Sequence, residues 1–364
     1  MKREPASAEP FRVVHVVGRV TDQVSSFLGP ATHALARAGR EQAVVMIDDL
    51  RHRRHIAGLH DAAELVMAPA RRNPIEQWRA LSQACRRTLL SSPLQALHLH
   101  GLWPGLVGAR AARAAGVTAP TFFSPHGSRS IAAPRGLGAL VLLAARPLLG
   151  PAGSAAIVNV QQEASAFGRW KSAEVVESPV GDVFFLQPRH EARHPLVITG
   201  GRTQGARSAE LLAQLAVLLS GEDLRISFNW IGTVDEVSRV RLGAAGVSVF
   251  DVSSDAECAA RLAAGWVYLA SGGTRGFPVF LAEAMAAGLP CVALDVPLHR
   301  EMIRDGETGY LCKTERDMIV RIATLIDDPA LRTRIGQAAR LEARRRFGES
   351  QFGIKLLAAY ALAS

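Results

Sequence analysis

Short, nearly continuous apolar runs alternate with longer mixed stretches in the first half of the chain. Such runs are typical of strands that are buried on both faces of a parallel sheet. The apolar residues of 27–38 recur instead at helical spacing, and this pattern ends at Gly39. We therefore expect the βαβ opening of a doubly wound α/β sheet, with strands at 11–17, 43–47, 95–100, 120–123 and 155–160.

The second half repeats this alternation after a break near residues 175–182. Ser178, Pro179 and Gly181 favour a linker, and 364 residues are more than one domain usually holds. We expect one domain over 1–186, a second over 187–346 and a C-terminal helix within 347–364. Strands are expected at 195–199, 226–231, 247–250, 267–269 and 291–294, and helices at 208–219, 256–264, 281–287, 317–346 and 351–362.

Two segments of the second half combine a strand, a glycine-rich loop and a helix. The first contains Gly201, Arg202 and Arg207, and the second contains Gly273 and a helix that carries Glu283. Free N–H groups at a helix N-terminus bind anions, and two arginines would neutralise a departing diphosphate. Glu283 could accept hydrogen bonds from ligand hydroxyls. The alternative for the second segment is a simple turn followed by a solvated helix acid.

Three histidines lie at or just after predicted strand ends. His98 and His100 end one strand, and His126 follows the next. Ligands of open α/β sheets bind at the carboxyl ends of the strands, so chemistry is expected here. The His-x-His spacing could bind a metal ion, but no acid or third ligand follows at a suitable spacing. We expect no metal site, and a simple hydrogen-bonded role is the alternative for each histidine.

The residues from Arg275 to Pro290 resemble the nucleotide-sugar motif of the retaining GT-B glycosyltransferases of family 4 (group 1). The family pattern is Glu-Gly-Phe-Gly-x-x-x-x-Glu followed by Ala-Met-Ala-x-Gly-x-Pro. This chain has Arg-Gly-Phe-Pro-Val-Phe-Leu-Ala-Glu followed by Ala-Met-Ala-Ala-Gly-Leu-Pro. Arg275 therefore replaces the first Glu, which the family associates with the donor sugar. Glu283 retains the second, which usually contacts the ribose hydroxyls.

The resemblance extends over nearly the whole chain and implies a GT-B architecture, two Rossmann-like doubly wound domains that face each other across a cleft. The last helix would cross back to the N-terminal domain. The implied reaction moves a sugar from a UDP- or GDP-linked donor to a glycan or polyprenyl-diphosphate-linked acceptor, with retention and without a cofactor, in bacterial surface polysaccharide biosynthesis. The implied catalytic residues are His126, Arg202 and Arg207, and those implied for donor binding are Gly18, Gly201, Gly273, Arg275, Gly276, Phe277 and Glu283.

The charge distribution and the composition limit the kinds of partner that the protein is expected to bind. The chain lacks Asp-x-Asp, so no divalent metal is expected on the diphosphate. Residues 1–186 hold 21 Lys and Arg against 13 Asp and Glu, a net charge of +8 out of the total +9. This excess favours an anionic membrane surface or acceptor, for which 51–55 and 130–153 are candidates; an arginine-rich genome is the alternative. No nucleic-acid signature accompanies the charge.

The expected location is the cytoplasm, with peripheral contact to the inner leaflet. The four cysteines show no paired spacing, and no apolar run reaches transmembrane length. Two other functions remain open: a non-catalytic GT-B scaffold, which the loss of the first Glu would explain, and a UDP-sugar 2-epimerase. Arg275 also permits a uronic acid donor, whose carboxylate a guanidinium binds in a bidentate manner.

Overall fold

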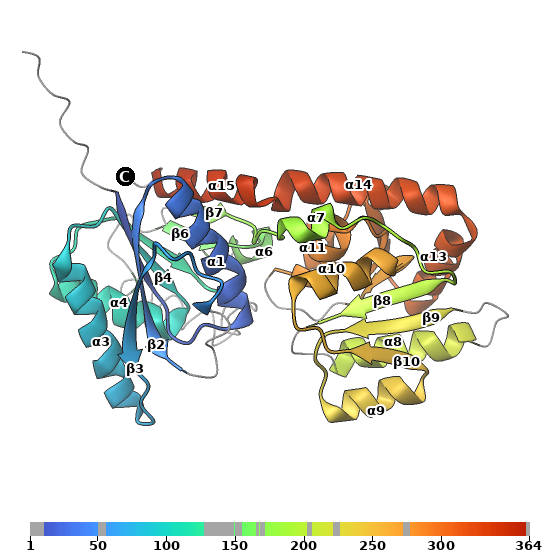
Figure 1. The fold of residues 1–364 in the computed structure, drawn as a ribbon, viewed down its shortest axis with the longest axis horizontal. Coiled ribbons are helices and arrows are strands. Elements are labelled where there is room, and N and C mark those ends of the chain that lie inside the picture. The colour runs from blue at the N-terminus through green and yellow to red at the C-terminus, as the bar shows by residue number, and fades with distance from the viewer. Residues whose placement is uncertain are drawn as a thin grey trace, which may run out of the picture. The chain divides into compact units, whose positions relative to one another are not determined.

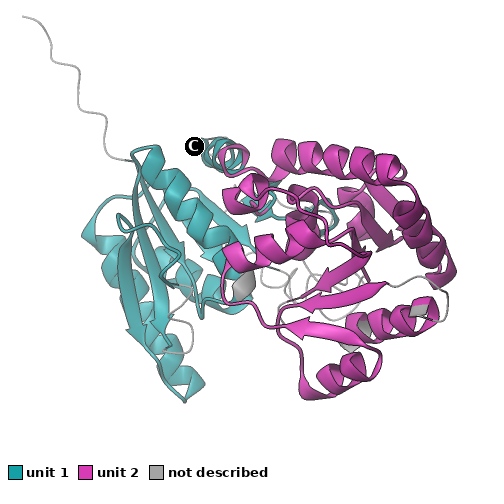
Figure 2. Ribbon diagram, turned by 45° about the vertical axis from the view of Figure 1, so that its right-hand side comes forward, with its two compact units in different colours: residues 1–177, 352–364 teal, residues 178–351 magenta. Residues whose placement is uncertain are grey.

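The computed structural model describes residues 11–49, 56–126, 149, 155–164, 167, 172–201, 206–220, 226–271 and 277–361. Contacts divide the chain into two compact units (Figure 2). The first consists of residues 1–177 and 352–364, and the second of residues 178–351. The division between Glu177 and Ser178 lies inside the segment whose Pro and Gly suggest a linker. A second division, between Gln351 and Phe352, falls inside the last helix.

The first unit is built on a seven-stranded sheet in the order β3-β2-β1-β4-β5-β6-β7, with every pair parallel (Figure 1). Its strands are β1 (Arg12–Val16), β2 (Glu41–Asp48), β3 (Glu64–Pro69), β4 (Ala96–His100), β5 (Thr121–Ser124), β6 (Ala155–Val158) and β7 (Ser172–Val175). The edge strands β3 and β7 are additions to the sequence prediction. Both are partly exposed. β7 lacks the continuous apolar run of a central strand, whereas β3 has one at residues 65–68 that the sequence prediction did not use.

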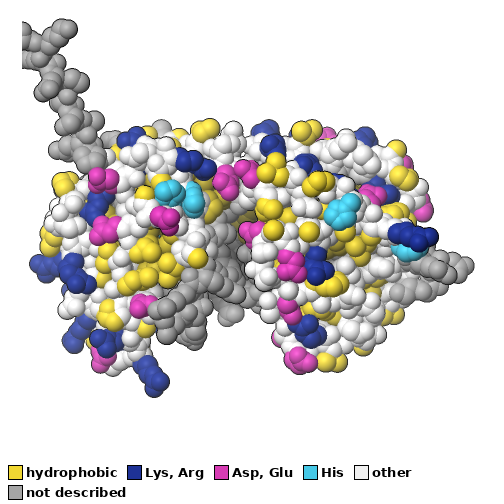
Figure 3. Space-filling model, viewed as in Figure 1, with side chains coloured by type: hydrophobic (Ala, Val, Ile, Leu, Met, Phe, Trp, Pro, Cys, Tyr) yellow, Lys and Arg dark blue, Asp and Glu magenta, His cyan; other side chains and the backbone are white. Residues whose placement is uncertain are grey.

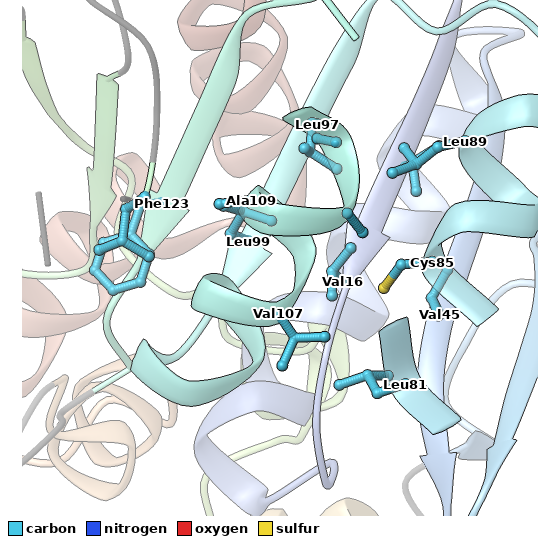
Figure 4. Packing of buried hydrophobic residues seen from close by; sticks show 14 of the residues in the cluster. Val16, Val45, Leu81, Cys85, Leu89, Leu97, Leu99, Val107, Ala109 and Phe123 are labelled. Carbon is cyan, nitrogen blue, oxygen red and sulfur yellow. The ribbon is translucent and has the colours of Figure 1, made fainter. Parts of the chain in front are cut away.

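Helices cover both faces of this sheet and create two apolar cores. The helices are α1 (Asp22–Arg37), α3 (Pro74–Ser91), α4 (Leu102–Ala114), α6 (Gln161–Ala164) and α15 (Glu349–Ala361). On one face, α3 and α4 pack through residues such as Leu81, Cys85 and Val107 against Val16 and Leu99 of the strands (Figure 4). Burial raises the pKa of the Cys85 thiol to about 12, so this cysteine stays protonated.

The other face of the first sheet is covered by α1 and by the C-terminal part of α15. Phe27 of α1 and Phe352 of α15 meet edge to face, with ring centroids 5.2 Å apart. Leu356 and Tyr360 continue this cluster along α15. The chain therefore returns, after the second unit, to complete the core of the first.

The second unit has a six-stranded sheet in the order β10-β9-β8-β11-β12-β13, again parallel throughout. Its strands are β8 (Leu196–Gly200), β9 (Ser227–Ile231), β10 (Val247–Phe250), β11 (Val267–Ala270), β12 (Cys291–Leu294) and β13 (Gly309–Cys312). Its helices are α7 (Asp182–Leu186), α8 (Ala206–Ser220), α9 (Glu236–Ala244), α10 (Asp255–Ala264), α11 (Val279–Ala286), α12 (Pro297–Met302), α13 (Glu315–Asp327) and α14 (Pro329–Phe347). The two parallel-sheet units confirm the predicted fold class.

Residues 317–346 are helical as expected, except for a break at one residue. The segment forms α13 and α14, which are separated at Asp328. Pro329 cannot continue the hydrogen bonding of α13, but it is well suited to the first position of a new helix. Asp328 then caps α14, since its Oδ1 accepts a hydrogen bond of 2.9 Å from the Leu331 N–H.

The two segments that are candidates for membrane contact lie almost entirely outside the described residues. Residues 51–55 lie outside the described residues, as does 130–153 except for the buried Leu149. Within the described ranges, no helix has the length and apolar character needed to cross a membrane. On the face drawn in Figure 3, basic and acidic side chains are interspersed rather than separated into two regions.

Candidate functional site

Each sheet contains one point where the strand order reverses (Figure 1). In the first unit β1 lies between β2 and β4, and in the second β8 lies between β9 and β11. At such a point the connections leave toward opposite faces and open a crevice beyond the carboxyl ends of the two strands. The loops after β1 and β4, and those after β8 and β11, are therefore the natural ligand positions of each unit.

Glycines bring the loop after β8 against the start of α11. A Cβ added at Gly200 would lie 2.5 Å from two ring carbons of Phe280, in the first turn of α11. Gly232 has φ +109°, and a Cβ there would lie 2.4 Å from the Gly201 carbonyl oxygen. Both places exclude a side chain. Gly200 and Gly201 are therefore held as bare backbone beside the helix that carries Glu283.

Glu283 is buried on α11, with 4% of its surface exposed. The Cys258 thiol lies 3.9 Å from Glu283 Oε2. Burial raises the pKa of nearby Tyr268 well above its usual value, and the charges of Cys291 and Glu283 add to this effect. The alternative of a solvated helix acid is therefore wrong. The carboxylate is held inside the second unit, one turn beyond the start of α11.

Only two of the other predicted site residues of the second unit belong to the described part of the chain. Phe277 is buried against Phe347, with ring centroids 5.3 Å apart and planes at 74°, so its ring anchors the end of the loop to α14. Arg207 lies in the first turn of α8. Arg202, Gly273, Arg275 and Gly276 lie outside the described residues.

Gly18 follows β1 in the first unit, and close packing against α4 explains why a glycine stands there. A Cβ added there would lie 2.8 Å from Cγ of Pro104, in the first turn of α4. The Gly18 carbonyl oxygen also accepts a hydrogen bond of 3.1 Å from the Ile47 N–H. The loop after β1 is therefore held against α4 at the strand-order reversal.

Four buried histidines gather where β1, β4 and β5 end. His15 on β1, His98 and His100 on β4, and His126 just after β5 are exposed by 0%, 0%, 1% and 9%. Burial lowers the pKa of His15 and of His126 to about 3. It also lowers the pKa of His98 and His100 well below the usual range, and the neighbouring histidines contribute further. All four rings are therefore neutral at pH 7.

Hydrogen bonds define the tautomer of His98. The Ser124 hydroxyl donates to the Ile157 carbonyl oxygen at 2.7 Å, so its Oγ must accept from His98 Nε2 at 2.8 Å. His98 Nδ1 is then an acceptor, and it receives the Tyr360 hydroxyl at 2.8 Å. Because Tyr360 belongs to α15, this bond joins the C-terminal helix to the centre of the sheet.

The remaining three histidines form a second chain. His15 Nδ1 lies 3.0 Å from His100 Nε2, and His100 Nδ1 lies 2.7 Å from His126 Nε2. The rings of His100 and His126 are stacked, with planes 10° apart. The two end atoms, His15 Nε2 and His126 Nδ1, are buried without a hydrogen-bond partner among the described residues.

The backbone of His126 is strained. Its φ is +49°, and within the described ranges it is the only residue other than glycine with a positive φ. This conformation costs roughly 1–2 kcal/mol for a residue with a Cβ. The strain is retained at the carboxyl end of β5, beside Phe27 at 5.5 Å between ring centroids. Such positions are frequent at ligand-binding sites.

The histidines also raise the question of a metal ion. Ring nitrogens of His15, His98 and His100 all lie within 4.8 Å of one another. Sequence reasoning missed His15 as a third member, although a polar residue inside an apolar strand run was the available signal. The hydrogen bonds described above use both nitrogens of His98 and of His100, so metal binding would have to break them. The arrangement favours a hydrogen-bonded chain over a metal centre.

Residues 196–342 match the family described as Glycosyl transferases group 1. The GtfA subunit of UDP-N-acetylglucosamine–peptide N-acetylglucosaminyltransferase from Streptococcus pneumoniae is 28% identical over 166 residues, which cover 44% of this chain and 33% of that protein. A phosphatidyl-myo-inositol mannosyltransferase from Mycobacterium leprae is 36% identical over 181 residues, 49% of this chain and 46% of that protein. The matches therefore span a third to a half of the relatives' length.

The crystal structure of Anabaena HepE in complex with UDP and glucose is similar over 97% of this chain and 100% of that one, with a TM-score of 0.77 and 15% identity. At this identity the likeness shows the fold, and it confirms the GT-B architecture. The match of residues 196–342 supports the expectation of an enzyme of the glycosyltransferase class. Residues 196–342 thus resemble the glycosyl transferases group 1 family, within a chain whose fold matches GT-B structures.

Proposed function

We propose that this protein transfers a sugar from a nucleotide diphosphate sugar to an acceptor, with retention at the anomeric carbon and without a metal ion. The observation that supports this most is the construction of the second unit. Its group 1 domain places glycine-rich segments after both strands of the reversal and a buried carboxylate, Glu283, on the helix that follows. Backbone N–H groups and arginines can stabilise a departing diphosphate.

The donor we favour is UDP-linked. HepE was crystallised with UDP and glucose, and the pneumococcal relative is named for UDP-N-acetylglucosamine. A GDP-linked donor is the second choice. In this proposal Glu283 binds the ribose hydroxyls, Arg202 and Arg207 neutralise the leaving diphosphate, and His126 contacts the donor sugar.

A thermal-shift screen with UDP, GDP and ADP, each with and without EDTA, tests nucleotide binding. A ligand that binds only the folded state at 100 times its Kd stabilises that state by about 2.7 kcal/mol. We expect UDP to raise the Tm, EDTA to leave the shift unchanged, and Arg202→Gln to reduce it. The exposed Arg241 of α9 supplies the matched control, Arg241→Gln. Absence of a shift with all three nucleotides would favour the non-catalytic scaffold.

Retention is tested separately from binding. UDP-glucose carries an α-linked glucose, so NMR of the newly formed product should show an α-anomer if the reaction retains configuration. A β-anomer would contradict the proposal even if UDP binds. Release of free UDP without a glycosylated product would leave only donor hydrolysis as an activity.

Arg275 bears on the donor sugar. We expect tighter binding of UDP-glucuronate than of UDP-glucose if its guanidinium pairs with the sugar carboxylate. Arg275→Glu should reverse that preference, because it restores the acid of the family motif. Equal affinities in the unaltered protein would eliminate a uronate donor without affecting the transferase proposal.

The acceptor we propose is an anionic glycan or lipid-linked diphosphate at a membrane surface, in surface polysaccharide synthesis. The +8 charge of residues 1–186 supports it, and the mycobacterial relative is named for a phospholipid substrate. Co-sedimentation with phosphatidylcholine vesicles, with and without phosphatidylglycerol, measures the attraction. Binding only to the anionic vesicles, weakened by salt, is expected. Equal recovery with both vesicle types would contradict a charge-driven contact.

A further inference from the structure

We propose that His15 and His100 hold His126 in the tautomer that carries a proton on Nδ1, so that His126 donates a hydrogen bond to a ligand oxygen. The identity of that ligand, a donor sugar, rests on the proposed function. The tautomer itself rests only on the geometry of the first unit. His15 and His100 would thus be positioning residues, and His126 the group that touches the ligand.

The chain has two consistent arrangements of its protons. In one, His15 Nδ1–H donates to His100 Nε2, His100 Nδ1–H donates to His126 Nε2, and His126 carries its proton on Nδ1. In the other, every proton is shifted to the opposite nitrogen, so that His126 Nδ1 is a bare acceptor and His15 Nε2 carries a proton. Both satisfy the 3.0 Å and 2.7 Å contacts. The two arrangements differ in which of the two end nitrogens, His15 Nε2 or His126 Nδ1, carries a proton.

Burial at the two ends decides between the arrangements. Each leaves one unpaired N–H and one unpaired lone pair, and a buried unpaired N–H is the rarer and costlier of the two. Both end nitrogens are buried. His15, however, lies inside the sheet with 0% of its surface exposed, whereas His126 follows β5 at the carboxyl edge of the sheet, where ligands of such sheets bind, and keeps 9% exposed. An N–H is better tolerated at His126, where a ligand can accept it. The first arrangement is therefore favoured.

No charged side chain pairs with this chain among the described residues. The titratable neighbours are His98 on β4 and Tyr360 on α15, which are hydrogen-bonded to each other. Phe27 of α1 covers the rings of His98, His100 and His126 with an apolar surface. Such surroundings disfavour an imidazolium. His126 is thus suited to donate to a neutral hydroxyl oxygen of a sugar and poorly suited to act as a general base.

Long-range ¹H–¹⁵N NMR of the histidine-labelled protein distinguishes protonated from bare ring nitrogens. We expect a proton on Nδ1 of His126, His100 and His15, and on Nε2 of His98. Protonated Nε2 on His126, or a doubly protonated ring, would overturn the proposal. This measurement needs no substrate, so it succeeds or fails independently of glycosyl transfer.

Two variants of His100 distinguish the effect of its hydrogen bonds from the effect of its packing. His100→Gln can accept from His15 and donate to His126, whereas His100→Leu can do neither. With UDP-glucose as the probe, we expect His100→Leu to raise its KM about tenfold more than it lowers kcat, which corresponds to about 1.4 kcal/mol in binding. His100→Gln and the exposed His33→Gln should stay within about threefold of the unaltered protein. Equal losses in the Leu and Gln variants would indicate a purely structural role.

An independent observation concerns a cavity of about 330 Å³ in the second unit. It is lined by the residues Arg189, Glu191, Gly288, Arg332, Thr333, Gln337 and Arg340. From this lining we infer a binding site for a phosphate group, either free or carried by a small metabolite. Three guanidinium groups face one carboxylate there, so the lining carries a net charge of +2.

The arginines differ in how completely they are paired. Arg332 donates to Glu191 at 3.1 and 2.8 Å and to the Leu325 carbonyl at 2.7 Å, so it is fully engaged. Arg189 shares Glu191 through Nη2 at 2.9 Å, but its Nη1 is buried without a partner among the described residues. An unpaired buried guanidinium N–H is costly. A phosphate oxygen would supply the missing acceptor.

Small and polar residues complete this cavity. Thr333 and Gln337 lie one turn apart on α14 and add hydroxyl and amide groups to the lining. Gly288, with φ +77°, ends α11; a Cβ there would lie 3.6 Å from Cδ of Arg340 and 3.8 Å from Cδ of Arg189. Both arginine stems therefore border the same small space. Hydroxyl, amide and guanidinium groups that donate hydrogen bonds into one space are common in phosphate-binding sites.

The test is a thermal shift with potassium phosphate against potassium chloride at equal ionic strength, in saturating UDP so that a nucleotide site is already occupied. We expect phosphate to raise the Tm of the unaltered protein and of Arg241→Gln, but not of Arg189→Gln. Gln337→Leu, which touches no ion pair, should reduce the shift. Glycerol 3-phosphate separates the two sources, because only a metabolite site should prefer it to free phosphate. Equal phosphate shifts in Arg189→Gln and the unaltered protein would overturn the assignment.

Discussion

The two units have the same topology at their strand-order reversals, but different chemical groups lie near the two reversals. In the first unit, four buried imidazoles gather where β1, β4 and β5 end. In the second, the glycine backbone after β8 lies beside α11, which carries the buried carboxylate of Glu283. Under the proposed function, side chains bind the ligand in the first unit, and main-chain N–H groups bind it in the second.

Under the proposed function, this difference follows from the ligand proposed for each unit. A diphosphate needs several N–H donors at close range, and a Cβ would obstruct them. A neutral sugar is recognised instead by directed single hydrogen bonds from rigid side chains. The buried histidine chain places titratable groups in the core of the first unit, so we expect the first unit to be the more sensitive to acid.

The largest expected effect is on stability in acid. Each histidine that is neutral when folded and has a pKa of 6.5 when unfolded binds its proton preferentially in the unfolded state. Its contribution is complete above pH 6.5 and is lost below that pH at about 1.4 kcal/mol per pH unit, for His15 and His126 until the pH reaches about 3. Four such residues give up to about 5 kcal/mol per pH unit in the first unit.

Hydrogen exchange with mass spectrometry between pH 7.5 and 4.5 checks this comparison. In the second unit, His299 is the one buried histidine among the described residues. Peptides from β1 and β4 should therefore lose protection at a higher pH than peptides from β8 and β11. Simultaneous loss in both units, or earlier loss in the second, would contradict the assigned role of the buried imidazoles.

Next in size is the effect of Glu283→Gln, which keeps the shape of the side chain and removes its charge. A hydrogen bond from a ligand hydroxyl to a carboxylate contributes about 1.5–3 kcal/mol, so the Kd for UDP should rise about 10- to 150-fold. Isothermal titration measures it. Glu210→Gln, an exposed acid of α8, should leave the Kd unchanged. An unchanged Kd in Glu283→Gln would assign this acid to structure alone.

Gly200→Ala tests the bare backbone of the second crevice. Its Cβ would overlap the Phe280 ring, so we expect a loss of about 1–3 kcal/mol in the free energy of unfolding. Gly243→Ala, inside α9 with no atom within 4 Å of the added Cβ, should instead stabilise by about 0.5–1 kcal/mol. Urea denaturation that gives the same sign for both variants would refute the close approach at Gly200.

The smallest effect concerns the bond between α15 and the histidines. Tyr360→Phe removes the donor to His98 Nδ1 and should cost about 1 kcal/mol. Ser124→Ala removes the acceptor on the other side of the same ring. Because both changes act on one chain of hydrogen bonds, the double variant should lose less than the two single losses added together. Strict additivity would show that the bonds act independently.

Much of the architecture could be predicted from local patterns. Continuous apolar runs marked the central strands of both sheets, and the glycine-rich segments after β8 and β11 marked the loops at the second reversal. The edge strand β7 lacks such a run and was missed, and β3 was missed although residues 65–68 form one. A continuous helical pattern hid the break before Pro329, where a proline at a new N-terminus was mistaken for a helix interior.

The amino-acid sequence by itself determined the alternation of strands and helices and the motif that ends in Glu283, because periodicity and turn residues act over a few neighbours. Tertiary structure alone decided that His15 joins His100 and His126, residues that lie 85 or more positions away from it along the chain. It also decided that Glu283 is buried and that Gly200 must be a glycine. Strand order and the close approach of distant backbones set these environments, and no local pattern encodes them.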